Sequence, residues 1–299
     1  MADVQIGPSI RAQLGKASPV IGRFEAMILL GFVIGKPREY LIAHDEAELT
    51  EDQILQFDML VDMRAAGTPV PYLTGSQEFF GRHFHVTDAV LIPRPDTEVL
   101  VEQALLVVAG NPKVLDLGTG SGCIGITLAL EIPGAQVTAT DASEAALEIA
   151  RGNAAELAAK VEFREGFWWD ALVPNSQFDL IVSNPPYIRP DDDHLRNLEY
   201  EPLQALTDGI NGLECLQAIA DGAIAHLTPG GWLLLEHGYD QGAEVRAMLE
   251  QAGFAAVRTK KDYGGNDRVT MGRRAKEPPI SSSLQRMPQL QVPNLAPRE

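Results

Sequence analysis

The sequence contains few cysteines, few basic residues and no long apolar run. Its two cysteines, Cys123 and Cys215, are too few for a disulfide framework or a zinc cluster, so we expect a reducing, cytoplasmic compartment and no metal site. Only 24 Lys and Arg stand against 41 Asp and Glu, and the formal net charge of −17 disfavours binding to a nucleic-acid backbone. No stretch reaches about 18 apolar residues, so we expect no transmembrane helix. The N-terminus lacks the apolar segment of a signal peptide.

Apolar residues make up 45% of the 299 residues, which is enough for a sizeable core and for two domains. Strand and helix patterns alternate over residues 113–274, as they do in a doubly wound α/β sheet. We therefore assign residues 99–274 to a sheet domain and residues 275–299, with several Pro and Ser, to a disordered tail. The aperiodic region 188–214 is predicted to be a substrate lid or docking loop. The predicted strands are 113–117, 136–140, 161–165, 178–183, 231–236, 253–259 and 267–272.

Residues 1–70 are predicted to form a small N-terminal helical domain. Segments 23–30 and 51–60 place apolar residues at the 3.6-residue period of an amphipathic helix. Thr50, which precedes two acidic residues, is a suitable N-cap for the second segment. The domain is too small for a catalytic core, so we interpret it as a helical cap that takes part in substrate recognition.

Residues 71–98 differ in composition from both neighbouring regions and are interpreted as a linker. The short apolar segments 79–80, 83–86 and 89–92 are predicted strands, of which some form a β-hairpin. Arg94 lies between two prolines and is either a solvated turn residue or a binding residue. The linker is therefore expected to contribute to function as well as to connect the two domains.

The most informative residues are Asn184, Pro185, Pro186 and Tyr187, directly after the apolar strand 178–183. Open α/β sheets bind ligands at the carboxyl ends of their strands. Two successive prolines fix two φ angles and remove two N–H donors, so nearby carbonyl groups stay free to accept hydrogen bonds. Together with the side-chain oxygen of Asn184 they form a rigid set of acceptors. Such a set suits a planar –NH2 group, either of an amide or of an exocyclic base amine.

A glycine-rich turn joins strand 113–117 to a helix. Glycines let the backbone approach a ligand, and the start of a helix offers free N–H groups. Asp141 ends the next strand, where it can accept hydrogen bonds from ribose hydroxyls. The turn alone also fits the nicotinamide-dinucleotide fingerprint. However, Asp116 would be unfavourable beside a pyrophosphate and could instead pair with a ligand ammonium, so an adenosine with a cationic amino-acid end, as in S-adenosylmethionine, suits both acids better. The turn consists of Gly118, Thr119, Gly120, Ser121 and Gly122.

Together these motifs resemble those of the class I S-adenosylmethionine-dependent methyltransferases. More narrowly, the chain is similar to the N5-glutamine methyltransferases that act on peptide chain release factors, and the resemblance extends over residues 10–274. The segments before the glycine turn and near the end of the sheet domain are its most specific parts, whereas Asn-Pro-Pro-Tyr also occurs in adenine-N6 DNA methyltransferases. The matching segments are 71–75, 91–98, 115–122, 184–188 and 262–269.

The resemblance implies a seven-stranded, Rossmann-like class I sheet and makes residues 99–274 the methyltransferase domain. It implies S-adenosylmethionine as cofactor and release factors as protein substrates, with the methyl group placed on the glutamine of a Gly-Gly-Gln tripeptide. Trp168 would flank the adenine, although a second tryptophan, Trp169, follows it. The residues implied to contact the cofactor are Gly118, Thr119, Gly120, Ser121, Gly122, Asp141, Trp168 and Asn184. Those implied to hold the glutamine are Asn184, Pro185, Pro186 and Tyr187.

The predicted chemistry is an orientation of the substrate amide. Its nitrogen is a weak nucleophile because the lone pair is delocalised, whereas a sulfonium methyl group is strongly electrophilic. Orientation can supply up to about 7–11 kcal/mol in favourable cases. We predict that Oδ1 of Asn184 and the carbonyl of Pro185, the two catalytic residues, accept the two amide hydrogens, and that Tyr187 packs on the amide plane. No strong general base is needed, because the N-methylated amide cation is very acidic.

Other functions fit parts of the sequence. An adenine-N6 nucleic-acid methyltransferase also acts on an –NH2 nitrogen whose lone pair is delocalised. It would, however, need base flipping and a basic groove. A ribosomal-protein glutamine methyltransferase, a nicotinamide-dependent oxidoreductase and a non-catalytic docking protein are further alternatives. We expect a monomer with release factors as partners and with no membrane or direct nucleic-acid contact. His237, at the end of a predicted strand, is expected to be a structural residue.

Overall fold

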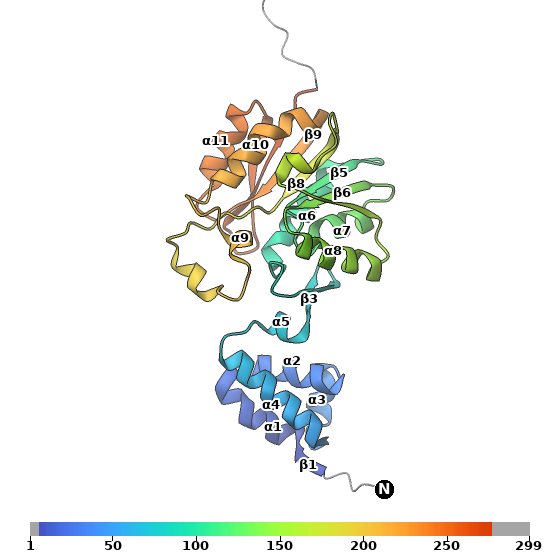
Figure 1. The fold of residues 1–299 in the computed structure, drawn as a ribbon, viewed down its shortest axis with the longest axis vertical. Coiled ribbons are helices and arrows are strands. Elements are labelled where there is room, and N and C mark those ends of the chain that lie inside the picture. The colour runs from blue at the N-terminus through green and yellow to red at the C-terminus, as the bar shows by residue number, and fades with distance from the viewer. Residues whose placement is uncertain (1–5, 277–299) are drawn as a thin grey trace, which may run out of the picture.

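The computed structural model of the protein describes residues 6–276, so the predicted disordered tail lies outside the described residues from residue 277 onwards. The N-terminal helices, a hairpin and a larger α/β part follow one another along the long axis of the molecule (Figure 1). Within residues 6–276, no helix has the length and apolar character needed to cross a bilayer. The elements before the large sheet are β1 (Ile6–Ser9), α1 (Ile10–Ile21), α2 (Arg23–Ile34), α3 (Arg38–Ala43), β2 (Glu48–Thr50), α4 (Glu51–Ala65), α5 (Val70–Thr74), β3 (Ser76–Phe79) and β4 (Arg82–His85).

The N-terminal helices pack around their own apolar core, in which Leu29, Leu30 and Phe57 are fully buried. Thr50 caps α4, as predicted. Its hydroxyl accepts a hydrogen bond from the N–H of Gln53 at 3.2 Å, and the Gln53 side chain accepts one from the N–H of Thr50 at 3.0 Å. The sequence does not predict the antiparallel pair of β1 and β2, because strands of four and three residues are too short to show a period.

The predicted hairpin is formed by β3 and β4, which pair antiparallel. The strand predicted at 89–92 is wrong: this segment has no strand partner. Its backbone is satisfied by side chains instead, since the carbonyl of Val90 accepts from the Tyr72 hydroxyl at 2.6 Å and the N–H of Ile92 donates to Glu201 at 3.0 Å. The apolar run of this segment therefore reflects burial against its surroundings and not sheet pairing.

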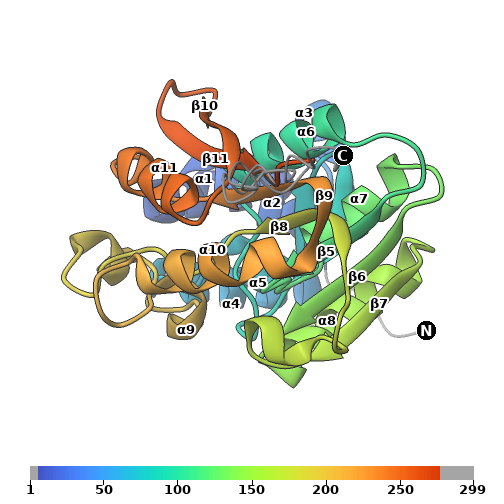
Figure 2. The same ribbon diagram turned by 90° about the horizontal axis from the view of Figure 1, so that it is seen from above.

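The larger part contains a seven-stranded sheet with helices on both faces (Figure 2). Its strands are β5 (Lys113–Leu117), β6 (Gln136–Asp141), β7 (Val161–Glu165), β8 (Phe178–Ser183), β9 (Leu227–Glu236), β10 (Ala255–Lys261) and β11 (Asp267–Arg273). The helices are α6 (Glu98–Val107), α7 (Cys123–Glu131), α8 (Glu144–Glu156), α9 (Leu203–Leu206), α10 (Glu214–His226) and α11 (Gly242–Gln251), with short 3-10 turns η1 (Pro95–Thr97), η2 (Trp168–Ala171) and η3 (Asp193–Asn197).

The sheet has the order β10-β11-β9-β8-β5-β6-β7. Strands β5 to β9 run parallel, whereas β11 is antiparallel to β9 and β10 is antiparallel to β11. All seven predicted strands are present; the largest difference in a boundary is at β9, which begins at Leu227 instead of residue 231. The chain runs from β5 outwards to β7 and returns to β8 on the other side of β5. The resulting switch point between β5 and β8 is where α/β sheets of this kind bind ligands.

Two apolar cores bury the two faces of the sheet. Because side chains alternate along a strand, Leu180 and Val182 pack with α6 and α7, whereas Ile181 between them packs with α10 and α11. Burial on both faces explains why the parallel strands are continuous apolar runs in the sequence. The rigid sheet holds the carboxyl ends of β5, β6 and β8 together.

Candidate active site

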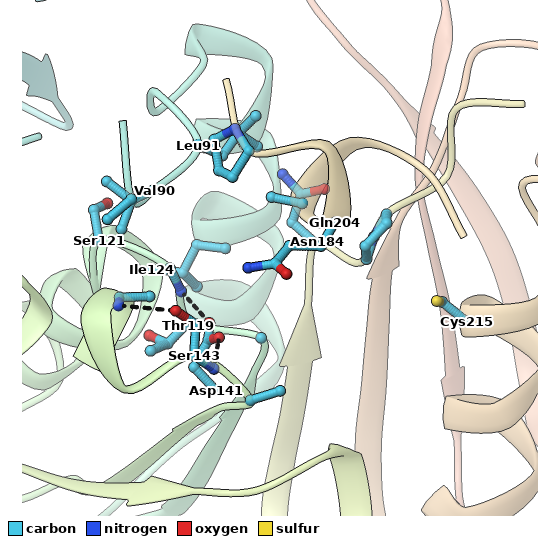
Figure 3. A pocket seen from close by; sticks show the side chains of 18 of the residues that line it. Val90, Leu91, Thr119, Ser121, Ile124, Asp141, Ser143, Asn184, Gln204 and Cys215 are labelled. Carbon is cyan, nitrogen blue, oxygen red and sulfur yellow. Dashed lines mark hydrogen bonds between the residues drawn. The ribbon is translucent and has the colours of Figure 1, made fainter. Parts of the chain in front are cut away.

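A cavity of about 590 Å³ lies at the carboxyl ends of β5, β6 and β8. The residues that line it come mainly from the linker, the glycine-rich turn with Asp141, the segment with Trp168, the residues that follow β8 and the predicted lid. Figure 3 shows Asp141, Thr119, Asn184 and Gln204 around the same space. The structure thus brings together, in one cavity, residues that the sequence separates by more than 80 positions.

The turn after β5 adopts a conformation that requires glycine. Gly118 and Gly120 have φ angles of 71° and 54°. The N–H groups of Gly118 and Thr119 both donate to the carbonyl of Thr140 at 2.9 Å, which ties the turn to β6. A Cβ atom at position 118 would lie 3.3 Å from the ring of Trp168. A side chain there would therefore press on the ring that lines the cavity.

Four of the five predicted turn residues line the cavity, and Gly122 does not. Gly122 has a φ of 84° and precedes α7. A Cβ atom on it would lie 3.1 Å from the Cβ of Ala150 in α8 and closer still to Ile126. The absence of a side chain at position 122 therefore lets α7 and α8 pack closely together.

Asp141 lies at the end of β6, as predicted. Its Oδ2 accepts from the N–H of Gly120 and its Oδ1 from the N–H of Ser143, both at 2.9 Å. Burial raises the pKa of Asp141, while these two N–H groups oppose the rise. They hold the carboxylate in the cavity wall, and each oxygen keeps a lone pair for a ligand hydroxyl.

Asp116 does not line the cavity, contrary to the prediction that it pairs with a ligand ammonium. Its fully buried carboxylate accepts from the Thr119 hydroxyl at 2.6 Å and from the N–H of Gly125 at 2.9 Å, both through Oδ2. Burial raises the pKa of Asp116 to about 6. The carboxylate therefore stabilises the glycine turn from outside the cavity and connects the turn to α7.

The two adjacent tryptophans have different positions. Trp168 lines the cavity, as predicted, and contacts the glycine turn. Trp169 instead stacks on His226, with ring centroids 4.8 Å apart, and its Nε1 donates to the carbonyl of Ala218 at 3.0 Å. Of the two, Trp168 is therefore the tryptophan that a ligand in the cavity can contact. Trp169 instead packs η2 against α10.

The side chain of Asn184 points into the cavity (Figure 3). Its Nδ2 donates to Oγ1 of Thr97 at 3.3 Å, and no residue in the described part of the chain donates to its Oδ1. Pro186 also lines the cavity, whereas Pro185 and Tyr187 do not. The Tyr187 hydroxyl instead donates to Oε1 of Glu236 at 3.1 Å. The ring of Tyr187 is therefore engaged behind the cavity wall in this structure.

Sequence reasoning missed two buried polar residues, Thr97 and Glu236, which are 2% and 1% exposed. A signal for Glu236 was available, because it is a single acid at the end of the apolar strand β9. His237 next to it is structural, as expected: Nδ1 bonds to the carbonyl of Gly238 and Nε2 to the Thr270 hydroxyl, each at 2.8 Å. Within residues 6–276, no cluster of three or more His, Cys, Asp or Glu could hold a metal ion.

The predicted lid contributes Pro202, Gln204 and Ala205 to the cavity. It is attached to the linker through Glu201, which forms an ion pair with Arg94 and accepts from the N–H of Ile92. A hydrogen bond from Tyr200 to the carbonyl of Ala66, at 2.7 Å, joins it to the end of α4. Arg94 thus proves to be part of the cavity and not a freely solvated turn residue.

Replacing Arg94 with alanine leaves the Glu201 carboxylate, whose side chain is 2% exposed, without its cation. Loss of a hydrogen bond to a charged group lowers the free energy of unfolding by about 1.5–3 kcal/mol, so we expect a shift of this size in a denaturant titration. We also expect faster hydrogen exchange at residues 198–206. Arg196→Ala is the matched control, because its ion pair with Asp193 is exposed. Equal stability of the two variants would show that Arg94 does not hold the lid.

Comparisons with known proteins agree with this architecture. A family model described as Methyltransferase small domain matches residues 95–199, and one described as PrmC N-terminal domain matches residues 9–75. The solved structure of a methyltransferase from Pyrococcus furiosus covers 66% of this chain and 91% of its own length, with a TM-score of 0.52 and 21% identity, which shows a common fold. The fold and the site define a class I methyltransferase.

Curated relatives narrow this class. A release factor glutamine methyltransferase from Xylella fastidiosa is 49% identical over 271 residues, which cover 89% of this chain and 98% of the relative. One from Bordetella pertussis is 47% identical over 260 residues, which cover 86% and 96%. The chain belongs to the family of release factor glutamine methyltransferases, which confirms the resemblance inferred from its motifs.

Proposed function

We propose that this protein transfers a methyl group from S-adenosylmethionine to the side-chain nitrogen (N5) of the glutamine in the Gly-Gly-Gln tripeptide of peptide chain release factors. The orientation of Asn184 carries the proposal, because its side chain points into the cavity and its Oδ1 has no donor among the described residues. The names of the relatives that match most of the chain support the same substrate.

The residues that line the cavity fit S-adenosylmethionine. Asp141 would accept hydrogen bonds from the ribose hydroxyls, the ring of Trp168 would pack against the adenine, and the turn at residues 118–121 would approach the amino-acid end through its backbone. The bound cofactor supplies an electrophilic sulfonium methyl group. The buried carboxylate of Asp116 keeps the turn in the shape that this binding needs.

The Asn184 side chain and the Pro185 carbonyl would act on the substrate amide as hydrogen-bond acceptors. Oδ1 of Asn184 would take one amide hydrogen. Pro185 does not line the cavity in this structure, so its carbonyl would take the other hydrogen only when the bound substrate amide reaches it. These bonds restrict the rotation of the –NH2 group and favour the rehybridised nitrogen whose lone pair faces the methyl group. Pro185 and Pro186 keep the two acceptors in place because both φ angles are fixed.

The carboxylates that line the cavity do not favour proton abstraction. Asp208 would have a raised pKa through burial, but N–H groups of Ile210, Gly212, Glu214 and Asn211 hold it below the usual value. The oxygens of Asp141 already accept from two N–H groups. The residues therefore support a reaction driven by orientation, in which the acidic N-methylated product loses its proton without a strong base.

We also propose the roles of the other parts of the chain. Residues 1–70 would recognise the release factor, residues 71–98 would link this domain to the site, and residues 99–274 would carry out the transfer. Segment 188–214 would act as the lid that contacts the substrate chain. A net charge of −17 suits a protein partner better than a phosphate backbone, and we expect a cytoplasmic monomer.

Transfer of tritium from methyl-labelled S-adenosylmethionine to a purified release factor tests the proposed function. We expect labelling of the intact factor and none of a variant with alanine in place of the Gly-Gly-Gln glutamine. DNA and ribosomal protein serve as competing substrates. Labelling of either of these, with no labelling of the release factor, would overturn the proposal in favour of a nucleic-acid or ribosomal-protein methyltransferase.

A further inference from the structure

We propose that Arg268 is a positioning residue for the methyl transfer. Through its ion pair with Asp96 it holds η1 in place, and η1 ends at Thr97, the partner of the Asn184 side chain. Neither Arg268 nor Asp96 lines the cavity. The inference rests on the proposed function for the role of Asn184 in orienting the substrate amide. It gives a function to segment 262–269, which the proposed mechanism does not otherwise use.

Arg268 is fixed to the sheet by its backbone and by its side chain. It lies in β11, and its carbonyl accepts from the N–H of His237, the residue after β9, at 3.0 Å. Its side chain is 12% exposed and donates through Nε and Nη2 to Oδ2 of Asp262, at 3.2 and 3.0 Å. Nη1 also donates to the carbonyl of His237 at 3.4 Å. The guanidinium group is therefore a rigid support, because it cannot move without breaking several of these bonds.

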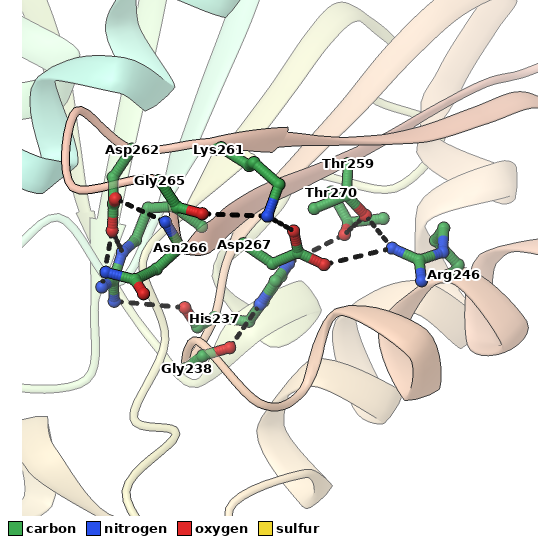
Figure 4. A network of polar contacts seen from close by, with 11 residues as sticks. His237, Gly238, Arg246, Thr259, Lys261, Asp262, Gly265, Asn266, Asp267 and Thr270 are labelled. Carbon is green, nitrogen blue, oxygen red and sulfur yellow. Dashed lines mark hydrogen bonds and ion pairs between the residues drawn. The ribbon is translucent and has the colours of Figure 1, made fainter.

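The loop between β10 and β11 keeps Asp262 in place for this contact. Oδ1 of Asp262 accepts from the N–H of Asn266 at 2.9 Å, and the N–H of Gly265 donates to the carbonyl of Asp262 at 3.0 Å. Figure 4 shows these three residues together at one end of a polar network. The loop is thus a compact turn that holds a carboxylate beside Arg268.

The ion pair with Asp96 connects this support to the wall of the cavity. Nη2 of Arg268 lies 3.2 Å from Oδ2 of Asp96, which belongs to η1. The Asp262 side chain is only 1% exposed and already neutralises the guanidinium group, so Arg268 does not need Asp96 to balance its charge. The Asp96 side chain is 47% exposed, and an ion pair of this kind contributes little to stability. We therefore infer that this pair serves to position η1.

The segment before α6 is held from two sides. Arg94 pairs with Glu201 of the lid, and Asp96, two residues further on, pairs with Arg268 of the sheet. The proline between Arg94 and Asp96 has a fixed φ angle, which limits the motion of the segment further. Thr97, the last residue of η1, therefore has a defined place in the wall of the cavity.

Thr97 transmits the position of η1 to Asn184. It is 2% exposed, and its Oγ1 accepts from Nδ2 of Asn184 at 3.3 Å. The oxygen and the nitrogen of a carboxamide lie in one plane, so a bond to Nδ2 also sets the direction of Oδ1. A shift of η1 would remove this bond and leave the Asn184 side chain free to rotate. A misplacement of about 1 Å can reduce turnover about 100-fold.

Asp96→Ala is the direct test, because it removes the bond to η1 and leaves Arg268 paired with Asp262. We expect kcat at saturating substrates to fall about 10-fold, since Thr97 is held less firmly. The cofactor Kd should stay within about twofold, because Asp96 lies outside the cavity. The Tm should change little, because the Asp96 side chain is half-exposed. A kcat within about twofold of wild type would overturn the proposal.

Arg246→Gln is the matched control for the loss of an ion pair. Arg246 of α11 lies 3.5 Å from Asp267, the first residue of β11, and Figure 4 shows this pair at the opposite end of the network from Asp262. The control should match wild type in kcat and in cofactor Kd. Equal losses of turnover in Arg246→Gln and Asp96→Ala would indicate a general effect on the sheet and would contradict a specific role of Arg268.

Arg268→Gln should lower kcat at least as much as Asp96→Ala does. It should also lower the Tm, because it leaves the buried carboxylate of Asp262 without its cation. The double variant should be no slower than Arg268→Gln alone, since both changes break the same bond. Losses that multiply in the double variant would show that Arg268 and Asp96 act independently, and the proposal would fail.

A second pair of variants separates positioning from a purely structural role. Thr97→Val removes the hydroxyl that Asn184 contacts and should lower kcat about 10-fold. In the Thr97→Val protein, Asp96→Ala should have no further effect on kcat. In Thr97→Ser, which keeps the hydroxyl, Asp96→Ala should still lower kcat about 10-fold. Equal effects of Asp96→Ala in the two proteins would show that it does not act through Thr97, which the proposal requires.

The NMR signals of the Asn184 side-chain –NH2 group provide a readout without turnover. Asp96→Ala should move these signals towards their positions in Thr97→Val, and Arg246→Gln should leave them where they are in wild type. If the signals behave in this way while wild type methylates no release factor, the proposed function fails and the positioning role stands. Signals that do not change in Asp96→Ala would contradict the positioning role, whatever the substrate.

Discussion

Asn184→Ala should reduce turnover by about 10²–10³-fold, the range found when one preorganised polar group at a reacting centre is removed. The variant loses Oδ1, an acceptor on a side chain that points into the cavity, and removes the Nδ2 group that donates to the Thr97 hydroxyl. The glycine turn, Asp141 and Trp168 are untouched, so we expect the cofactor Kd to stay within about threefold. Single-turnover kinetics with release factor and a separate cofactor titration measure the two quantities.

Asn111→Ala is the control for this experiment, because Asn111 is an exposed loop residue outside the cavity. It should match wild type in both measurements. Turnover by Asn184→Ala within a factor of a few of wild type would show that the orientation of the amide does not depend on this oxygen, and the mechanism would have to be abandoned.

Asp141→Ala should have the opposite profile, with weak cofactor binding and a smaller effect on kcat at saturation. The variant removes the acceptor for the ribose hydroxyls and also leaves the N–H groups of Gly120 and Ser143 without partners. A lost hydrogen bond to a charged group costs about 1.5–3 kcal/mol, so the cofactor Kd should increase about 10- to 100-fold. Isothermal titration calorimetry with S-adenosylhomocysteine gives the value directly.

Glu144→Ala tests whether charge alone explains such a loss. Glu144 is an acid in the first turn of α8, near Asp141 in sequence, and its ion pair with Arg151 is exposed. Removing it changes the net charge as Asp141→Ala does, yet its Kd should stay within about twofold because exposed ion pairs contribute little. Similar losses in the two variants would contradict a direct contact between Asp141 and the cofactor.

The sheet could be predicted closely because its signals are local. Parallel strands that are buried on both faces appear as apolar runs, and the helices between them have their own period, so all seven strands were found. The strand predicted at 89–92 is wrong because the apolar run there has another cause, burial without sheet pairing. The backbone there is satisfied by Tyr72 and Glu201, and no strand pattern can reveal a partner 109 positions away.

The site could be predicted where its residues follow strand ends. Asp141 is the last residue of β6 and Asn184 directly follows β8, and the switch point brings such strand ends together. The position of Asp116 could not be predicted, because a carboxylate at a strand end can face either the ligand or the next helix. Thr97 and Glu236 were missed because their hydrogen bonds, with Asn184 and with Tyr187, join residues that are far apart in the sequence.

A crystal structure of the protein with S-adenosylhomocysteine and a Gly-Gly-Gln peptide tests the central claim most directly. The account predicts that the glutamine side-chain nitrogen lies about 3 Å from both Oδ1 of Asn184 and the carbonyl oxygen of Pro185. The same structure should show Nδ2 of Asn184 still directed at Thr97. A glutamine bound through its carbonyl oxygen to an Asn184 –NH2 group, or bound away from Asn184, would contradict the account.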